Sequence, residues 1–230
     1  MMNPSEVALI VGAGPGFSGH VARRLVARGM SVVLASRRAD PTLASQLGAT
    51  AMSFGAGDPA ATAQLFADVE AKFGGPPSFV MYNPSGRVRG EFVDIDPDAV
   101  RQAINVTAFG GFLVAQEAAK RMVPRGAGKI LLTGATASVK GVPRSAAFAM
   151  GKFALRGLAQ SMARELHPKG VHVLHVVIDG AIRNVAGQDD DPGEVRLDPA
   201  ALADATLNLL DQPRSVWAWE VDLRPWVETF

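Results

Sequence analysis

The sequence predicts a doubly wound α/β protein, with a parallel sheet of seven strands between two layers of helices. Short apolar, β-branched runs alternate with longer segments of helical period, as in βαβ units around a buried parallel sheet. A glycine-rich loop follows the first of these runs and leads directly into a helical segment. With 230 residues, 48% of them hydrophobic, the chain can bury one large core, so we expect a single domain over residues 1–230.

The strands are expected in the apolar runs, and the helices in the segments between them. The predicted strands cover residues 7–11, 31–36, 50–53, 78–82, 129–133, 171–178 and 217–222. The first helix is expected over 20–28, directly after the glycine loop. Four later helical segments each follow an Asp-Pro pair, at 40–41, 58–59, 96–97 and 198–199. An Asp side chain accepts from free amides of the first turn, and Pro suits the first helical position, so these aspartates are interpreted as caps.

Composition excludes several classes of function. The net charge of +1 gives no basic surface for nucleic acid, and there is no cysteine for a disulfide or a thiolate zinc site. His20, His167, His172 and His175 show no metal-ligand spacing with carboxylates. No basic leader precedes the first apolar run, and no run approaches the ~20 apolar residues of a membrane span. We therefore expect a cytoplasmic protein without a membrane or nucleic-acid partner, and a surface loop or lid over 186–194.

The glycine loop predicts a dinucleotide site. Gly12, Gly14 and Gly16, followed by Phe17, lie between the first strand and the first helix. Glycines allow a tight turn and a close approach of the backbone to a pyrophosphate, whose charge then lies at the helix N-terminus. The alternative is a glycine-rich turn without a ligand.

The residues at the end of the second predicted strand indicate which dinucleotide the site is expected to bind. NAD-binding proteins usually place a carboxylate there, on the ribose hydroxyls. This chain has Ser36 and Arg37 instead, a hydroxyl and a forked cation suited to a 2′-phosphate, so NADP(H) is the expected cofactor. The alternative interpretation is that Arg37 and Arg38 are an ordinary solvated charge pair.

With these features the chain resembles the short-chain dehydrogenase/reductase family, which has the Rossmann-type fold, along nearly its whole length. Four blocks carry the resemblance: the loop at 12–16, Tyr-Asn-Pro-Ser-Gly at 82–86, Asn105 within Ile-Asn-Val-Thr, and Phe-Ala-Met-Gly-Lys at 148–152. The resemblance implies an oxidoreductase acting on a small molecule. It also implies cofactor contacts from Asn83, Lys152, Gly180 and Ile182.

The departures from the family pattern fall on its chemistry. Phe148 stands at the family's tyrosine position and Ala135 at its serine position, whereas Lys152 and Asn105 of the family's proton relay are retained. Loss of a general acid typically lowers the rate by about 10²–10⁴, so ordinary carbonyl reduction should be slow or absent. We therefore expect an atypical branch of the family. Its protein is an NADP(H)-dependent oxidoreductase with a non-standard site or, alternatively, a non-catalytic NADP(H)-binding sensor or partner subunit.

Smaller departures concern the cofactor pocket. Ser18 occupies the place of the loop's third glycine, although Gly14, Gly16 and Gly19 offer a shifted GxGxxG register. Gly55 stands where an aspartate often meets the adenine, and Asp179 replaces the usual proline before Gly180. Because backbone amides hold most of a pyrophosphate, these changes affect the details of binding more than binding itself.

Several other groups are candidates for roles at the site. Tyr82, the one tyrosine, is interpreted as pocket wall or packing, and the proton donors left open are Ser138, Thr136, Ser145, Lys152 or a water on Asn105. Cations on the loops after the strands could attract an anionic substrate, and they are Arg87, Arg89, Lys140, Arg144 and Arg183. The alternative is ordinary loop charge, since loops are often charged and the acidic run 189–191 lies close in sequence. The helical segments 97–122 and 145–167 have wide apolar faces that predict a homo-oligomer, a dimer or tetramer, with the candidates Phe109, Phe112, Leu113, Phe153, Leu155 and Leu158.

Overall fold

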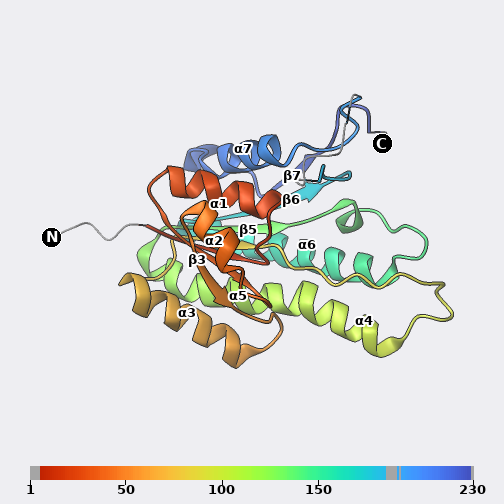
Figure 1. The fold of residues 1–230 in the computed structure, drawn as a ribbon, viewed down its shortest axis with the longest axis horizontal. Coiled ribbons are helices and arrows are strands. Elements are labelled where there is room, and N and C mark those ends of the chain that lie inside the picture. Colours follow the sequence, from red (N-terminus) through yellow and green to blue (C-terminus); the bar gives the residue numbers. More distant parts are fainter. Residues whose placement is uncertain (1–5, 185–190, 192, 229–230) are drawn as a thin grey trace.

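The computed structural model describes residues 6–184, 191 and 193–228 and contains the predicted sheet (Figure 1). Seven strands form one parallel sheet in the order β3-β2-β1-β4-β5-β6-β7. The doubly wound fold class is therefore confirmed. The predicted loop over 186–194 lies mostly outside the described residues.

The sheet lies between two helical layers, which bury β1, β4 and β6 throughout and leave the edge strands β3 and β7 partly exposed. The strand bounds are β1 Val7–Val11, β2 Ser31–Ser36, β3 Thr50–Ser53, β4 Phe79–Tyr82, β5 Gly128–Thr133, β6 Val171–Ile178 and β7 Glu220–Leu223. Alternate side chains of the central strands point into two separate cores: Leu9 and Val80 belong to one, Ile10 and Met81 to the other.

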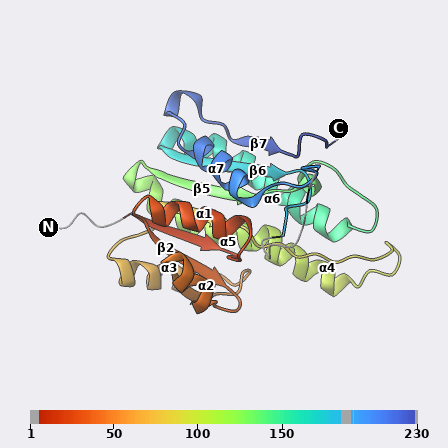
Figure 2. The same cartoon turned by 45° about the horizontal axis from the view of Figure 1, so that its top comes forward.

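The helices cover both faces of the sheet (Figures 1 and 2). The core on one face is closed by α1 Phe17–Ala27, α2 Pro41–Leu47 and α7 Pro199–Leu210. The core on the other face is closed by α3 Pro59–Phe73, α5 Gly110–Met122 and α6 Ala146–Leu166. The remaining α-helix, α4 Pro97–Ile104, continues through a π-helical turn, Asn105–Phe109, into α5.

All four Asp-Pro pairs start helices as predicted. Asp40, Asp58, Asp96 and Asp198 each accept a hydrogen bond from a backbone amide of the first turn, with a proline at the first helical positions. These carboxylates are therefore used in capping, a contribution worth about 1 kcal/mol each.

Two element starts differ from the prediction by three residues, whereas those of β4 and β5 differ by one residue. α1 begins at Phe17 rather than residue 20, because Phe17 is itself buried against the sheet. β7 begins at Glu220 rather than residue 217, because Trp217 stacks on His172 and donates to the Gln212 carbonyl. The amide of Ala218 is bonded to the Gln212 side chain as well, so this segment joins the sheet only afterwards.

The strand order places a crevice at the carboxyl ends of β1 and β4. β1 pairs with β2 on one side and with β4 on the other, so the chain leaves these strands in opposite directions across the sheet. Open α/β sheets bind ligands at such a switch point. The glycine loop follows β1 and the Asn83 loop follows β4, both at this edge.

Candidate functional site

Gly12 makes the sharp turn out of β1. Its φ of +80° lies in the left-handed region, and its amide donates to the Ala35 carbonyl at 2.8 Å. A Cβ at Gly12 would lie 2.7 Å from atoms of Pro84. Asn83 closes this contact from the other side, because its side-chain amide donates to the Gly12 carbonyl at 3.0 Å. The first glycine is thus held by the loop after β4.

The other glycines of the loop divide into two kinds. Gly14 and Gly16 have open space where a Cβ would be, as a close approach to a ligand requires. A Cβ at Gly19 would instead lie 2.7 Å from the Gly14 carbonyl oxygen. Gly19 therefore allows the close contact of helix and loop that the third glycine of a GxGxxG motif provides, in the shifted register.

Ser18 adapts to its unusual position by turning inward. Its side chain is 3% exposed, and its hydroxyl accepts from the Gly14 amide at 3.0 Å. This hydrogen bond therefore holds the glycine loop against the first turn of α1. The same bond occupies a backbone amide that a bound pyrophosphate could otherwise use.

A cavity of about 520 Å³ lies beside the glycine loop at the ends of β1 and β2. Gly12, Ser36 and Arg37 line it, and the side chain of Arg37 is exposed. The Ser36 hydroxyl donates to the Arg38 carbonyl at 2.6 Å and so stabilises the turn that carries Arg37. Phe54 and Ala56, which follow β3 and which the sequence did not single out, add an apolar wall.

A second cavity of about 700 Å³ continues from the first, since Ser85, Arg87 and Val88 line both. Asn83, Ala135, Phe148, Lys152, Gly180 and Ile182 all line it. The structure thus brings together predicted site residues from four separate segments of the chain. Each of the two volumes lies in the range of small-molecule and cofactor sites.

Lys152 is buried in the wall of the larger cavity, with 3% of its surface exposed. Its ammonium donates to the Thr133 carbonyl at 2.5 Å. Burial, and then the neighbouring charge of Arg87, lower the pKa of Lys152 to about 7. The hydroxyl oxygen of Thr133 is buried without a hydrogen-bond partner, so this corner of the cavity has polar atoms available to a ligand.

Phe148 lies between two cations. The Arg87 guanidinium carbon is 4.3 Å from the ring centroid, and the Lys152 Nζ is 5.9 Å from it. Cations are attracted to the face of an aromatic ring. The ring at the family's tyrosine position therefore organises the charges of the cavity, although it has no hydroxyl to exchange a proton.

Tyr82 does not supply the missing phenol. It is 1% exposed, its hydroxyl donates to the Val106 carbonyl, and burial raises its pKa. It is a core side chain of β4.

Asn105 lies at the start of the π-helical turn and outside the lining of both cavities. Its side-chain amide donates to the Gly57 carbonyl at 3.5 Å. In this structure the residue ties the helix to the loop after β3.

The open candidates for a proton donor fall in different places. Thr136 and Ser145 line the larger cavity, as Lys152 does. Ser138 is fully buried and does not line it.

The candidate cations fall into two groups, those that line the larger cavity and those that form ion pairs outside its lining. Arg87, Arg89 and Lys140 line the cavity. Arg144 pairs with Glu91 and Arg183 with Asp198, and neither contributes to the lining.

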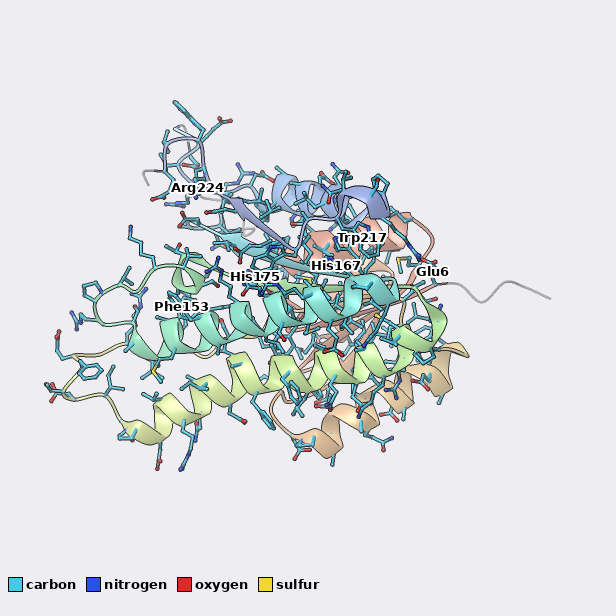
Figure 3. The ribbon with its side chains drawn as sticks, turned by 180° about the vertical axis from the view of Figure 1, so that it is seen from behind. Glu6, Phe153, His167, His175, Trp217 and Arg224 are labelled. Atoms are coloured by element: carbon cyan, nitrogen blue, oxygen red, sulfur yellow. The ribbon has the colours of Figure 1, made fainter. Side chains whose placement is uncertain are left out.

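A buried polar network behind the cavity was not anticipated from the sequence. Nδ1 of His175 lies 2.9 Å from a Glu220 carboxylate oxygen, and Nε2 lies 3.5 Å from the Ser138 hydroxyl. Ser138 in turn accepts from the Ala135 amide at 3.1 Å. In Figure 3, His175 lies beside α6, between the end marked by Arg224 and the end marked by Glu6. The only signal was a histidine within an apolar strand.

The charges of this network are fixed by burial. Burial first of all lowers the pKa of His175, to about 4, so the ring is neutral near pH 7. Although burial acts to raise the pKa of Glu220, hydrogen bonds from Arg156 and His175 hold it below its usual value. A carboxylate can only accept, so Nδ1 carries the proton and Nε2 accepts from Ser138. The network thereby holds the wall of the cavity at Ala135.

The loop after β6 closes the other side of the cavity. Gly180 has a φ of +148°, and a Cβ there would lie 2.8 Å from Pro225. Asp179 takes the place of the usual proline, and its amide donates to the Leu223 carbonyl at 2.9 Å. Ile182 forms a bridge with Leu197. The loop is therefore anchored to the segment after β7.

These features fit a dinucleotide. The exposed Arg37 lines the smaller cavity, and Thr133, whose hydroxyl has no partner, lines the larger one. Gly14 and Gly16 lie outside both linings, with open space where a Cβ would be. None of the helices in the described part of the chain combines the length and apolarity needed to cross a lipid bilayer.

Comparisons with known proteins agree with the fold. Versicolorin reductase 1 of Aspergillus parasiticus is 35% identical over 187 residues, which are 77% of this chain and 70% of that protein. The cyclic-di-GMP-binding biofilm dispersal mediator protein of Escherichia coli K12 is 31% identical over 194 residues, 81% of this chain and 77% of that one. A crystal structure of a short-chain dehydrogenase from Rhodopseudomonas palustris, 30% identical, superimposes with a TM-score of 0.84 over 96% of this chain and 99% of that one.

The short chain dehydrogenase model matches residues 6–188. With this match over most of its length, the chain belongs to the short-chain dehydrogenase family, whose oxidoreductases use nicotinamide cofactors and act on small molecules.

Proposed function

We propose that this chain is an NADP(H)-dependent oxidoreductase whose active site works without the family's tyrosine. The observation that supports the proposal is the pair of adjoining cavities, because most of the residues expected to bind the cofactor line them, while Phe148 and Ala135 stand at the two positions expected to carry hydroxyls. The chain belongs, on this proposal, to an atypical branch of its family.

Different residues of the chain would bind different parts of the cofactor along the two cavities. Gly12, Gly14, Gly16 and Phe17 would hold the pyrophosphate at the start of α1, and Ser36 with Arg37 would hold the 2′-phosphate. In the larger cavity Lys152 would donate to the ribose hydroxyls, with Asn83, Gly180 and Ile182 as walls. When bound, the nicotinamide supplies or accepts a hydride.

Proton transfer would have to use the groups that line the cavity. Lys152 has a pKa of about 7, near the value at which a general acid is most effective. Thr136 and Ser145 also line the cavity and would offer hydroxyl groups as proton donors. Asn105 would act only indirectly, through its hydrogen bond to the loop at Gly57.

Titration of the purified protein with NADPH and NADH, followed by cofactor fluorescence, is the direct test. We expect NADPH to bind and NADPH consumption to be detectable on a broad panel of carbonyl, enoyl and quinone substrates. Failure to bind either cofactor would overturn the proposal.

A non-catalytic NADP(H)-binding sensor or partner subunit is the second candidate. It is favoured by the position of Tyr82, the only tyrosine in the chain, in the core away from the cavity. One relative bears a name that describes ligand binding rather than turnover. Tight binding of NADPH with no turnover across the same panel would select this function.

The cytoplasm remains the proposed location, and a homo-oligomer the proposed assembly. Phe109, Phe112 and Phe153 are 43%, 40% and 44% exposed, whereas Leu113 and Leu155 are buried in the core. They belong to α5, α6 and the π-helical turn, which lie side by side on one face of the sheet (Figure 3). The rings of Phe109 and Phe112 stack with centroids 6.2 Å apart, and large exposed apolar patches mark interaction sites.

Light scattering after gel filtration tests the assembly. The unmodified protein should be a dimer or tetramer, and Phe112→Lys with Phe153→Lys should yield a monomer. Phe92→Lys, at an 83% exposed position in the loop after β4, should leave the mass unchanged.

A further inference from the structure

The larger cavity is lined by positive charge without described negative charge. Four of its lining residues are cationic: Arg87 and Arg89 after β4, Lys140 after β5, and Lys152 on α6. No aspartate or glutamate is among the described residues that line it. A low-dielectric cleft with one sign of charge concentrates ligands of the opposite sign.

Nearby cations outside the lining are paired, whereas those inside it are not. Arg144 lies 3.1 Å from a Glu91 oxygen, and Arg183 forms an ion pair with the cap of α7. Within the described part of the chain, Arg87, Arg89 and Lys140 have no carboxylate at ion-pair distance. Among the described residues, Arg144 and Arg183 are thus neutralised, whereas Arg87, Arg89 and Lys140 are left to a ligand.

The charges inside the cavity also act on each other. Arg87 lies over the Phe148 ring, and after burial its charge is the second cause that lowers the pKa of Lys152 to about 7. Two cations beside one aromatic ring repel each other, and the attraction of both to a nearby anion offsets this repulsion. An anionic ligand would relieve this repulsion.

The phosphates of a dinucleotide do not account for all of these cations. Gly12 and Ala13 at the start of the glycine loop line the smaller cavity together with Arg37, and the pyrophosphate and the 2′-phosphate are expected on this side. Arg87 borders both cavities, but Arg89 and Lys140 line only the larger one. The lining that they share also includes the apolar residues Val142 and Ile182.

Resting on the proposed NADP(H)-dependent function, we propose that the substrate of this cavity is a carbonyl compound bearing an anionic group, which Arg87, Arg89 and Lys140 hold while the carbonyl lies toward Lys152. A carboxylate and a phosphate share the required chemistry, because both accept paired hydrogen bonds from a guanidinium.

The test compares matched ligand pairs by calorimetry on the protein saturated with NADP⁺. One pair is benzoylformate and its methyl ester; the other is dihydroxyacetone phosphate and dihydroxyacetone. The anionic member of at least one pair should bind about tenfold more tightly than its neutral partner. This factor is the low end of the range for charge-assisted hydrogen bonds, because the three cations are exposed. Which pair discriminates shows whether carboxylate or phosphate is preferred.

Variants assign the effect to the cavity. Arg87→Gln, and separately Arg89→Gln with Lys140→Gln, should each reduce the preference for the anion several-fold, and added salt should weaken it further. Arg164→Gln is the matched control, because Arg164 lies roughly 24 Å along α6 from Phe148. Melting curves confirm that each variant is folded.

The outcomes separate this inference from the proposed function. If NADP⁺ binds and neither anion is preferred, the inference is overturned and the proposed function stands. If the cavity variants weaken NADP⁺ but leave the anion preference intact, these cations serve the cofactor and the inference is again overturned. If NADP⁺ itself does not bind, it is the proposed function that fails.

Discussion

Arg37 is the residue on which cofactor choice is expected to depend. It lines the smaller cavity with an exposed side chain, whereas Arg38 does not line it. NADPH should bind more tightly than NADH, by about tenfold, because a solvent-exposed charge pair is partly screened. Arg37→Ala should remove most of this preference and Arg38→Ala should retain it, as measured by fluorescence titration. Equal affinities for the two cofactors in the unmodified protein would contradict the assignment.

Phe148 and Ala135 are expected to limit ordinary carbonyl reduction. Each differs from the family's residue by one oxygen, and both line a cavity wide enough to admit it. Phe148→Tyr with Ala135→Ser should therefore raise NADPH-dependent reduction of activated ketones or quinones, since Arg87 and Lys152 lie beside the ring and favour the phenolate. NADPH affinity should stay within a few-fold.

Lys152→Met in the same background is the control for that gain. Without the ammonium the new phenol keeps only Arg87 as a cationic neighbour, so most of the added activity should be lost. A double variant that is folded, binds NADPH and shows no gain on a wide ketone panel would mean that the cavity serves another reaction or none.

At the residue scale the sequence could identify many residues that line the cavities, although it missed Phe54 and Ala56 and included Asn105, which lies outside both. It could not identify which of these residues have partners. Arg87 and Arg183 look alike in the sequence, each on a loop after a strand. Only the fold shows that Arg183 pairs with the cap of α7, 15 positions away, while Arg87 lies over Phe148. The hydrogen bond of His175 could not be predicted for the same reason, because its partner Glu220 is 45 positions away in the sequence.

At the element scale the glycines of the loop should separate experimentally into two kinds. Gly19→Ala should lower thermal stability, because a Cβ there meets the backbone oxygen of Gly14 at 2.7 Å and neither group can move freely. Gly14→Ala should leave the fold intact, since no atom lies within 4 Å of its Cβ, but should weaken NADPH binding by occupying the space of the pyrophosphate. Melting curves and cofactor titrations measure both, and equal behaviour of the two variants would contradict this division.

Element starts were predictable where local chemistry decides them and not where distant packing does. The Asp-Pro pairs gave four helix starts because the cap and its amides are neighbours in the chain. The start of β7 depends on a ring stack between Trp217 and His172, which are joined only through the sheet. Hydrophobic period alone therefore placed that strand three residues too early.

At the scale of the whole molecule, His175 should make stability depend on pH. Its folded pKa of about 4 lies below the ordinary value of 6.5, so between these values the unfolded chain binds the proton more readily. The free energy of unfolding should therefore fall as pH drops from 7 toward 4, with this residue contributing up to about 3 kcal/mol.

Urea unfolding at several pH values measures this dependence. His175→Gln should flatten it, because glutamine has no proton to gain. His20→Gln is the matched control with a smaller effect, since the pKa of His20 is lowered too but its side chain is only partly buried. An unchanged slope in His175→Gln would show that the network does not govern acid sensitivity.

The contact between Gly12 and the loop after β4 bears on how the protein is made. During synthesis the ribosome releases the glycine loop long before Asn83 and Pro84, and strands β2 and β3 emerge in between. Until the later loop arrives, the Gly12 carbonyl lacks its amide donor and the turn lacks its neighbouring ring. A nascent chain that already carries the complete nucleotide motif is therefore not yet a nucleotide-binding protein, and the cofactor can assist folding only after β4 has been added beside β1.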